Sequence, residues 1–355
     1  MEQKRKLLII DGSSMLVTNY FATLPPQVKM AKTDEERIKN YHRIMKSPDG
    51  RYTNAVFTTL KAVKAIIDGP YGFTHMAICF DKTRNTFRRE LYQEYKANRK
   101  PTQEPLKEQF ILMEQVFEQI GLKVLYSDQF EADDLAGSVA KQFSPEFDSV
   151  RILTKDTDYY QLADDSANIR LWMLQTKEDT ALDIIRRNTS YLFSNETVEE
   201  HVKELYGHTP KNIVEFTEEY VFGEKGVYPD LIVELKAIEG DTSDNIPGVK
   251  NVSSAAAPLL NEYGSLEGIY EAIDECEGIA KKEKELATFW KEKLEIKRSP
   301  IKSMLAGRES AFLSRELAQI KTDIDLGMKV DDMMIHVNEK KLKEVCEELG
   351  IKKLN

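Results

Sequence analysis

The chain has 355 residues, of which 41% are hydrophobic and 31% charged, so it can bury a full core and hold one large domain with a smaller one appended. Its net charge of −10 excludes a generally basic nucleic-acid binder but is compatible with a local basic stripe. No run of about 18 or more apolar residues occurs, which excludes a membrane span. Three cysteines without pair-like spacing indicate a reduced, cytoplasmic setting.

Short β-rich runs alternate with helical patterns in the first half of the chain. The runs that favour strands are residues 7–11, 75–80, 122–127, 150–154 and 169–174. Apolar spacings of three and four predict helices at residues 54–67, 107–120 and 132–143. This alternation predicts an α/β fold with a mostly parallel central sheet that has helices on both faces.

Beyond about residue 190 the strand signal fades and helical patterns take over. These patterns lie at residues 197–206, 231–238, 254–263, 266–273, 281–297 and 314–321. We therefore expect three parts: a core at 1–190, a helical domain at 191–300, and a C-terminal segment at 301–355 that packs back on the core. Two charged or glycine-containing stretches, 25–50 and 213–229, are interpreted as exposed elaborations.

Nine carboxylates form five clusters, and nearly every cluster lies where a predicted strand ends. They are Asp11, Asp81, Glu131, Asp133, Asp134, Asp156, Asp158, Asp241 and Asp244. The carboxyl ends of parallel strands meet at one edge, so these acids should converge there and repel one another unless a cation is present. Since no His or Cys accompanies them, the set suits Mg²⁺ or Mn²⁺. Their number indicates two ions, the arrangement that cuts phosphodiesters.

Each acidic cluster also has a simpler interpretation when taken alone. The acids of FEADD would favour the first turn of a helix, TKDTD would form a polar turn after a strand, and GDTSDN would form a loop before a helix. Within FEADD, Glu131 and Asp134 should share a helix face and leave Asp133 to point elsewhere. Asp156 and Asp158 should lie on one side if the strand continues. The joint pattern favours the metal site.

The segment at residues 82–107 is locally basic, with eight Lys or Arg against three Glu. Phe87, Tyr92 and Tyr95 interleave with these cations, so the segment could track phosphates while its aromatic rings stack on unpaired bases. Arg88 and Lys96 could also stabilise charge on the phosphate being cut. The alternative is a solvated amphipathic helix with its aromatic side chains packed inward.

A later stretch, residues 246–270, predicts two short helices around a tight turn. Such a turn can present backbone amides to a phosphate, although an ordinary helical hairpin explains the pattern equally well. The five His residues form no ligand spacing, and the chain contains neither GxGxxG nor a P-loop, so nucleotide binding has no support.

Together these residues resemble the bacterial and phage 5′ nuclease family, which includes the 5′–3′ exonuclease domain of bacterial DNA polymerase I and the flap endonucleases. The resemblance covers nearly the whole chain. It runs through IIDGSSML, FDKTRNTFRRELYQEYKANRKPT, EADDLAGSVAK, RILTKDTDYYQL, LKAIEGDTSDNIPGV and LSRELAQIKTDIDL. It implies a PIN-like 5′-nuclease core, a helical arch at about 82–107, and a helix-hairpin-helix-type domain.

The resemblance implies a structure-specific 5′–3′ exonuclease or flap endonuclease of DNA replication and repair. The nine acids would hold two Mg²⁺ or Mn²⁺ ions, and Lys96 and Arg88 would contact the scissile phosphate as catalytic residues. Further DNA contacts are implied for Arg84, Arg89, Tyr95, Arg99, Lys100 and Lys250. The partner would be DNA with a 5′ flap or 5′ end, or an RNA primer, bound by a monomer.

The sequence departs from the family at two places. Val17 and Thr18 stand where the family usually has an aromatic residue and an Arg. In the hairpin, GVKNVSSAAAP replaces GVxGIGxKTA, so Asn251, Val252 and Ser253 differ and Pro258 enters. These changes predict a weaker grip on duplex DNA and argue against a K⁺ site. A catalytically weakened nucleic-acid-binding protein, a ribonuclease acting on RNA primers, and a metal-dependent phosphatase are the alternatives.

Overall fold

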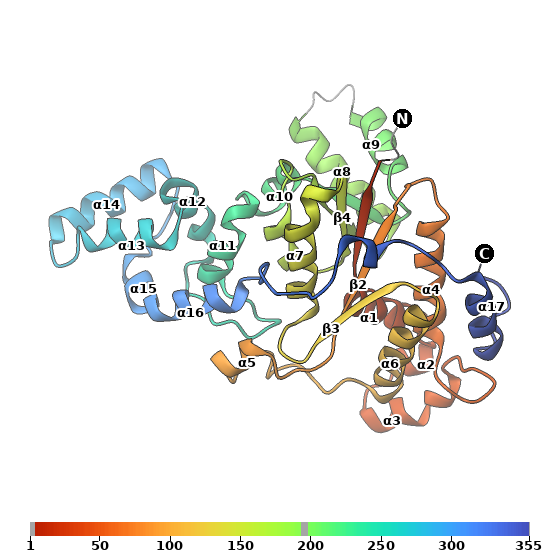
Figure 1. Ribbon diagram of the computed structural model, residues 1–355. Helices are drawn as coiled ribbons and strands as arrows, with labels where there is room; N and C mark the ends of the chain where they lie inside the picture. Colours follow the sequence, from red (N-terminus) through yellow and green to blue (C-terminus); the bar gives the residue numbers. More distant parts are fainter. Residues whose placement is uncertain (1–3, 193–197, 355) are drawn as a thin grey trace.

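The computed structural model describes residues 4–192 and 198–354. Its centre is a six-stranded sheet covered by helices on both faces, and a helical arm extends to one side (Figure 1). No helix within the described ranges is long and apolar enough to cross a membrane.

The sheet has the strand order β3-β2-β1-β4-β5-β6, and its neighbours are parallel except for β6, which runs antiparallel to β5. The strands are β1 (Lys6–Asp11), β2 (His75–Asp81), β3 (Lys123–Ser127), β4 (Ser149–Thr154), β5 (Ile169–Leu174) and β6 (Ile213–Phe216). The strand order reverses between β1 and β4. A crevice at the carboxyl ends of these two strands is therefore the place where such a sheet binds its ligand.

The alternating side chains of β1 build a separate hydrophobic cluster on each face of the sheet. Leu8 and Ile10 pack with helices α1 (Gly12–Thr23), α4 (Asn54–Ile67), α6 (Glu104–Gln119) and α17 (Glu339–Glu348). Leu7 and Ile9 join the cluster of α7 (Ala132–Phe143), η3 (Thr157–Leu162), α8 (Glu178–Leu192) and α11 (Ile232–Glu239). Burial on both faces explains why β1 is a continuous apolar run.

The helical arm is built from the second half of the chain. Its helices are α12 (Ser253–Tyr263), α13 (Leu266–Asp274), α14 (Ala280–Lys293), α15 (Ile301–Ala306) and α16 (Arg308–Ala318). After α16 the chain returns to the core, where the Ile335 amide donates to the Thr74 carbonyl at 2.9 Å and the Asn338 amide donates to the Ile120 carbonyl at 2.9 Å. The remaining helices beside the sheet are α9 (Val198–Gly207) and α10 (Glu218–Lys225).

The predicted fold class, a mostly parallel sheet with helices on both faces, is confirmed, and the five expected strands are present. The interpretation of 213–229 as an exposed elaboration is wrong, because Ile213, Val214 and Phe216 are buried in β6 beside β5. A four-residue strand is too short to stand out from the sequence pattern. The domain boundary near residue 190 stays a prediction, although the sheet itself continues beyond it.

The expected helical arch at 82–107 is also different in the structure. Helix α5 covers only Phe87–Leu91, turns follow, and α6 begins at Glu104 with Pro105 in its first turn. Pro101 disfavours a continuous helix at this point, and Lys96 has a left-handed φ of 54°. The segment is therefore a short helix followed by turns that lie against the core.

The other expected elaboration, 25–50, is mostly exposed. It contains α2 (Pro26–Lys29) and α3 (Asp34–Lys39), and the buried side chains of Val28 and Ile44 attach it to the core. Met30, in contrast, is exposed. The segment is thus anchored at two points and solvated elsewhere.

Candidate metal and nucleic-acid site

Three acids lie at the carboxyl ends of neighbouring parallel strands. Asp11 ends β1 and accepts hydrogen bonds from the Ser14 amide at 2.9 Å and from the Thr154 hydroxyl, at the end of β4, at 2.8 Å. Asp81 ends β2 and accepts from the Ala132 amide at 2.9 Å. Asp156 lies two residues after the end of β4 and is exposed. The sheet topology therefore brings together acids that are up to 145 positions apart in the sequence.

The electrostatic surroundings show that these acids share one neighbourhood. Burial raises the pKa of Asp11 to about 6, and the negative charge of Asp81 contributes to this increase. Burial likewise raises the pKa of the Tyr159 hydroxyl, and the carboxylates of Asp11, Asp133 and Asp156 raise it further. Asp11, Asp81 and Asp156 have no cationic partner within the described residues, and we call them the uncompensated acids.

Asp133 lies between the two kinds of acid in the site. Burial raises its pKa well above the ordinary value, and the Arg88 guanidinium, whose Nη1 lies 3.8 Å from Asp133 Oδ1, only partly opposes this. Its carboxylate accepts from the Asp134 amide at 2.7 Å. Asp133 therefore has a weaker ionic contact than its neighbours in the FEADD motif.

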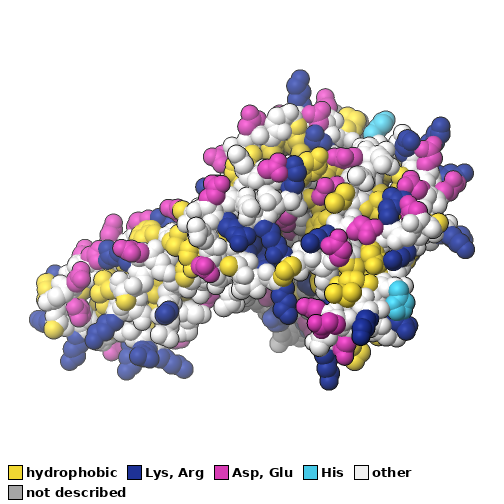
Figure 2. Space-filling model, turned by 90° about the horizontal axis from the view of Figure 1, so that it is seen from below, with side chains coloured by type: hydrophobic (Ala, Val, Ile, Leu, Met, Phe, Trp, Pro, Cys, Tyr) yellow, Lys and Arg dark blue, Asp and Glu magenta, His cyan; other side chains and the backbone are white. Residues whose placement is uncertain are grey.

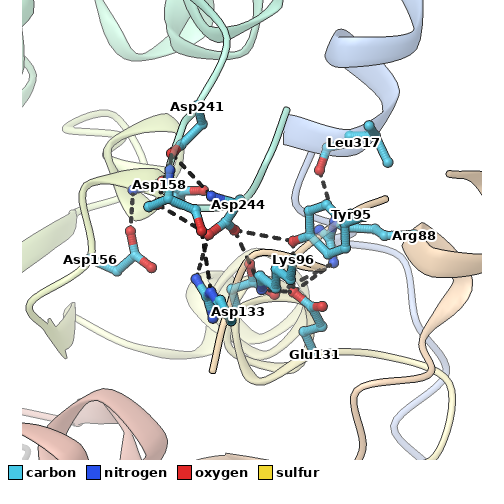
Figure 3. A network of polar contacts seen from close by, with 12 residues as sticks. Arg88, Tyr95, Lys96, Glu131, Asp133, Asp156, Asp158, Asp241, Asp244 and Leu317 are labelled. Carbon is cyan, nitrogen blue, oxygen red and sulfur yellow. Dashed lines mark hydrogen bonds and ion pairs between the residues drawn. The ribbon is translucent and has the colours of Figure 1, made fainter. Parts of the chain in front are cut away.

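The remaining five acids each face a Lys or Arg, and we call them the paired acids: Glu131, Asp134, Asp158, Asp241 and Asp244. Figure 3 shows this network, in which side chains from the 82–103 segment reach across to α7 and to the loop at 241–245. Four cations of the protein itself, Arg88, Lys96, Arg99 and Lys236, offset most of the charge of these five acids.

Arg88 and Asp134 form a fully buried ion pair. The two guanidinium nitrogens lie 2.6 and 2.7 Å from the two Asp134 oxygens, and Arg88 also donates to the carbonyls of Leu317 and Gln319. The exposed fractions of the two side chains are 1% and 0%. Asp134 further accepts from the amides of Glu131 and Lys321. Arg88 and Asp134 therefore neutralise each other in the core of this structure, and the contact of Arg88 with the phosphate and the binding of an ion by Asp134 stay predictions.

Lys96 lies between two paired acids. Its ammonium is 2.6 Å from Glu131 and 3.4 Å from Asp244, and 23% of its side chain is exposed. Burial favours the neutral form of Glu131, but Lys96 and Arg88 outweigh it and lower the pKa of that carboxyl. Tyr95 was expected to be a DNA-contacting aromatic residue, but it is buried, and its hydroxyl donates to Glu131 at 3.1 Å. Its ring is therefore unavailable for stacking on a base.

Lys236 on α11 is a site residue that the sequence did not reveal. Its ammonium contacts Asp158 and lies 2.9 Å from Asp241. Burial raises the pKa of Asp241, but Lys236 outweighs this effect and lowers it to about 2. For Asp158, burial and Asp156 dominate over Lys236, and its pKa is raised. Because β4 ends at Thr154, Asp156 and Asp158 do not alternate along a strand as expected.

The turns after α5 are held against the loop at 241–245 by reciprocal contacts. The Lys96 amide donates to the Asp244 carbonyl at 2.8 Å, the Asn98 amide group donates to the Thr242 carbonyl at 2.7 Å, and the Asn245 amide group donates to the Glu94 carbonyl at 2.7 Å. Arg99 adds an ion pair to Asp244. We call this set of contacts the latch, and it keeps Lys96 beside the acids.

The other expected DNA contacts lie at or near the surface. Arg84 is exposed and donates to the Lys100 carbonyl at 2.9 Å, Arg89 is half-buried, and Lys100 and Lys250 are exposed. Figure 2 looks onto the carboxyl edge of the sheet and shows Lys and Arg side chains gathered around a depression between the arm and the core. Their role in binding DNA stays a prediction.

The altered hairpin lies between α11 and α12. Gly248 is required there, because a Cβ would be 2.3 Å from the Gly240 nitrogen, and Asn251 adopts a left-handed φ of 63°. Pro258 lies inside α12. The predictions of a weak duplex grip and of no K⁺ site remain predictions.

The donor chemistry of the site fits a hard divalent cation, since every acid at the edge offers oxygen and the uncompensated acids lack a balancing charge. In the part of the chain that the structure describes, no three His, Cys, Asp or Glu side chains are close enough together to hold one ion. Carboxylates at this edge of a parallel sheet, with cations beside them, are compatible with the class of metal-dependent nucleases.

Known proteins place the chain in a family. The family model described as the 5′-3′ exonuclease N-terminal resolvase-like domain matches residues 6–203, and the model for the C-terminal SAM fold matches residues 227–341. The chain therefore belongs to the 5′-3′ exonuclease family. The family resemblance and the nuclease class expected from the sequence are confirmed.

Relatives of known name agree with this assignment. DNA polymerase I of Lactococcus lactis strain IL1403 is 30% identical over 99% of the chain, which spans 32% of that protein. A 5′-3′ exonuclease of Buchnera aphidicola is 25% identical, and the match covers 94% of this chain and 92% of that protein. The chain thus spans about a third of the length of its DNA polymerase I relatives.

Two solved structures share the fold. A bacteriophage T5 flap endonuclease, in a complex with DNA and metal ions, aligns with a TM-score of 0.53 at 20% identity and covers 98% of this chain and 100% of its own. The catalytic core of Rad2, in complex with a DNA substrate, aligns with a TM-score of 0.51 at 12% identity and covers 98% of this chain and 89% of its own.

Proposed function

We propose that the protein hydrolyses DNA phosphodiesters as a structure-specific 5′–3′ exonuclease or flap endonuclease that uses two Mg²⁺ or Mn²⁺ ions. The observation that carries this proposal is the placement of acids from five separate segments around the carboxyl ends of β1, β2 and β4, beside Lys96. The DNA and metal ions bound by the T5 relative support the same chemistry.

The uncompensated acids Asp11, Asp81 and Asp156, together with Asp133, would hold the ions. When bound, such ions activate a water and stabilise charge on the leaving oxygen. Lys96 would move from Glu131 toward the phosphate and offset its negative charge, since its ammonium is partly exposed. Arg88 has no part in this proposal beyond positioning α5 against α7, because its guanidinium is taken by Asp134.

The substrate would be DNA with a 5′ flap or 5′ end, and an RNA primer is the second substrate to test. We place the protein in the cytoplasm as a monomer, and we expect no K⁺ requirement, because the hairpin turn has Asn251 and Ser253 in place of glycines.

A series of flap substrates tests the substrate assignment. Labelled 5′ flaps of increasing length, with and without a downstream duplex, should be cut in Mg²⁺ near the junction, and rates should depend only modestly on the duplex. A blunt duplex without a 5′ flap serves as the control. Equal rates on all substrates, or cutting at internal sites of a circular single strand, would contradict structure-specific action.

A further inference from the structure

The helical arm separates positive from negative charge along the sequence. Residues 251–279, which include the hairpin helices α12 and α13, contain six Asp or Glu and no Lys or Arg. Residues 281–302, which include all of α14 except Ala280, contain eight Lys or Arg against four Glu, a net charge of +4. We call the eight cations of this second stretch the arm cations: Lys281, Lys282, Lys284, Lys291, Lys293, Lys297, Arg298 and Lys302. Figure 2 shows basic side chains along one edge of the arm and acidic ones along the opposite edge.

The arm cations are exposed, and seven of the eight have no carboxylate partner within 4 Å among the described residues. Lys281 reaches Glu285 only at 3.9 Å, and Lys282 donates to the Glu275 carbonyl. Helix α17 offers a contrast, since each of its three lysines, Lys340, Lys341 and Lys343, lies within 4.0 Å of an acid three or four residues on. A row of unpaired cations creates a positive potential that attracts a polyanion.

The arm cations are presented by a rigid support. Trp290 is fully buried under α14, and its indole N–H donates to the Tyr263 hydroxyl of α12 at 2.8 Å. Leu286 and Leu294 pack against the same core. At 1.5 Å per residue the 14 residues of α14 span about 21 Å, the length of about six base pairs of duplex.

The chemistry of this surface fits a duplex backbone better than a single strand. Single strands are gripped by aromatic rings that stack on bases, but here Trp290 is buried and only Phe289 is partly exposed on α14. Phosphate contacts alone position a protein on a duplex without reading its sequence. The basic edge of the arm is also visible from the side that shows the catalytic edge of the sheet (Figure 2).

We propose that the arm cations of residues 281–302 form the surface that binds the phosphate backbone of the duplex part of the substrate, in place of the acidic hairpin. This inference rests on the proposed function for the identity of its ligand. Residues 251–279 offer a phosphate six acids and no Lys or Arg. Among the described residues, only Glu267 and Asp274 of these acids are paired, with Arg315 and Arg308 respectively. The positive surface that follows therefore supplies the attraction.

The test replaces Lys291, Lys293, Lys297 and Lys302 with Gln and measures binding to a labelled duplex by fluorescence anisotropy at several salt concentrations. All four side chains are exposed, so folding should be unaffected. Each lost phosphate contact lowers the slope of log affinity against log salt by about 0.9, so the loss of four contacts should lower the slope by about 3.6 and weaken the affinity at least about tenfold. The matched control replaces four lysines elsewhere with Gln: Lys340, Lys341, Lys343 and Lys352. This control should leave the salt slope and the duplex affinity unchanged.

Cleavage of a single-stranded 5′ tail separates this inference from the proposed function. The arm variant should cut such a tail at the wild-type rate and should lose only the modest increase in rate that a downstream duplex gives the wild type. An unchanged salt slope in the arm variant, or an equal loss in the control variant, would overturn the assignment. Failure of the wild type to cut any substrate would refute the proposed function, whereas duplex binding would still decide the role of the arm.

Discussion

The two halves of the acidic site differ in how their charge is balanced. The paired acids are neutralised by Arg88, Lys96, Arg99 and Lys236, which come from the 82–103 segment and from α11. The uncompensated acids at the ends of β1, β2 and β4 have hydrogen bonds from neutral groups alone within the described residues. One half is therefore organised by the protein itself, whereas the other half needs charge from a bound ion.

The largest effect is expected from the uncompensated half. Asp11→Asn should lower the flap-cleavage rate by about a thousandfold, because an ion's stabilisation of transition-state charge is worth several kcal/mol. The measurement is single-turnover cleavage, together with Mn²⁺ binding followed by electron paramagnetic resonance. Asp128→Asn, at an exposed acid that pairs with Lys82, is the control. If Asp11→Asn bound Mn²⁺ with the affinity of the wild type, Asp11 would not be a ligand of the metal ion.

The second effect concerns stability rather than chemistry. Arg88→Ala should lower the free energy of unfolding by about 3 kcal/mol or more, because it leaves the Asp134 carboxylate buried without a partner. Urea unfolding measures this, and Arg89→Ala, the half-buried neighbour on α5, should change stability by less than about 1 kcal/mol. Equal stability of the two variants would show that the Arg88–Asp134 pair does not organise this half.

Lys96→Ala should lower turnover by about a hundredfold, as expected when one charged group at the phosphate is lost. Stability should change little, because part of the side chain is exposed and the Tyr95 hydroxyl still reaches Glu131. Lys96→Arg is the comparison variant, since it keeps the charge. Turnover at the wild-type level in Lys96→Ala would show that Lys96 only offsets the charge of Glu131 and Asp244 and does not act on the phosphate.

The smallest effect is expected from the latch. Asn98→Ala removes one hydrogen bond to the Thr242 carbonyl, which is worth about 1 kcal/mol. Hydrogen exchange of residues 92–99 should become several-fold faster, while global unfolding stays within about 0.5 kcal/mol of the wild type. Asn85→Ala, at an exposed position outside the latch, is the control. Unchanged exchange in Asn98→Ala would mean that the latch does not hold the segment.

The sequence was informative wherever a pattern was long and local. The apolar runs of β1, β2 and β4 and the periodicity of α4 and α7 predicted the sheet, and the acids at the strand ends predicted the edge where they meet. The short strand β6 was missed because four residues carry too little signal.

Long-range packing decided the features that the sequence could not show. Arg88 and Arg89 are adjacent and chemically identical, and only the docking of α5 against α7 and the Leu317 carbonyl decides which one points inward. Lys236 joins the site because α11 packs beside Asp158, 78 residues away in the sequence. The basic residue in the last turn of α11, five positions before Asp241, was the one local signal for it.

The most direct test of the account is cleavage of a 5′-labelled flap by the wild type and by Asp156→Asn, in Mg²⁺ and in EDTA. We expect the wild type to cut in Mg²⁺ and not in EDTA, and we expect Asp156→Asn to cut in neither while its binding of the flap is retained. Cutting by the wild type in EDTA, or equal rates for the two proteins in Mg²⁺, would contradict the claim that the uncompensated acids act through bound metal ions.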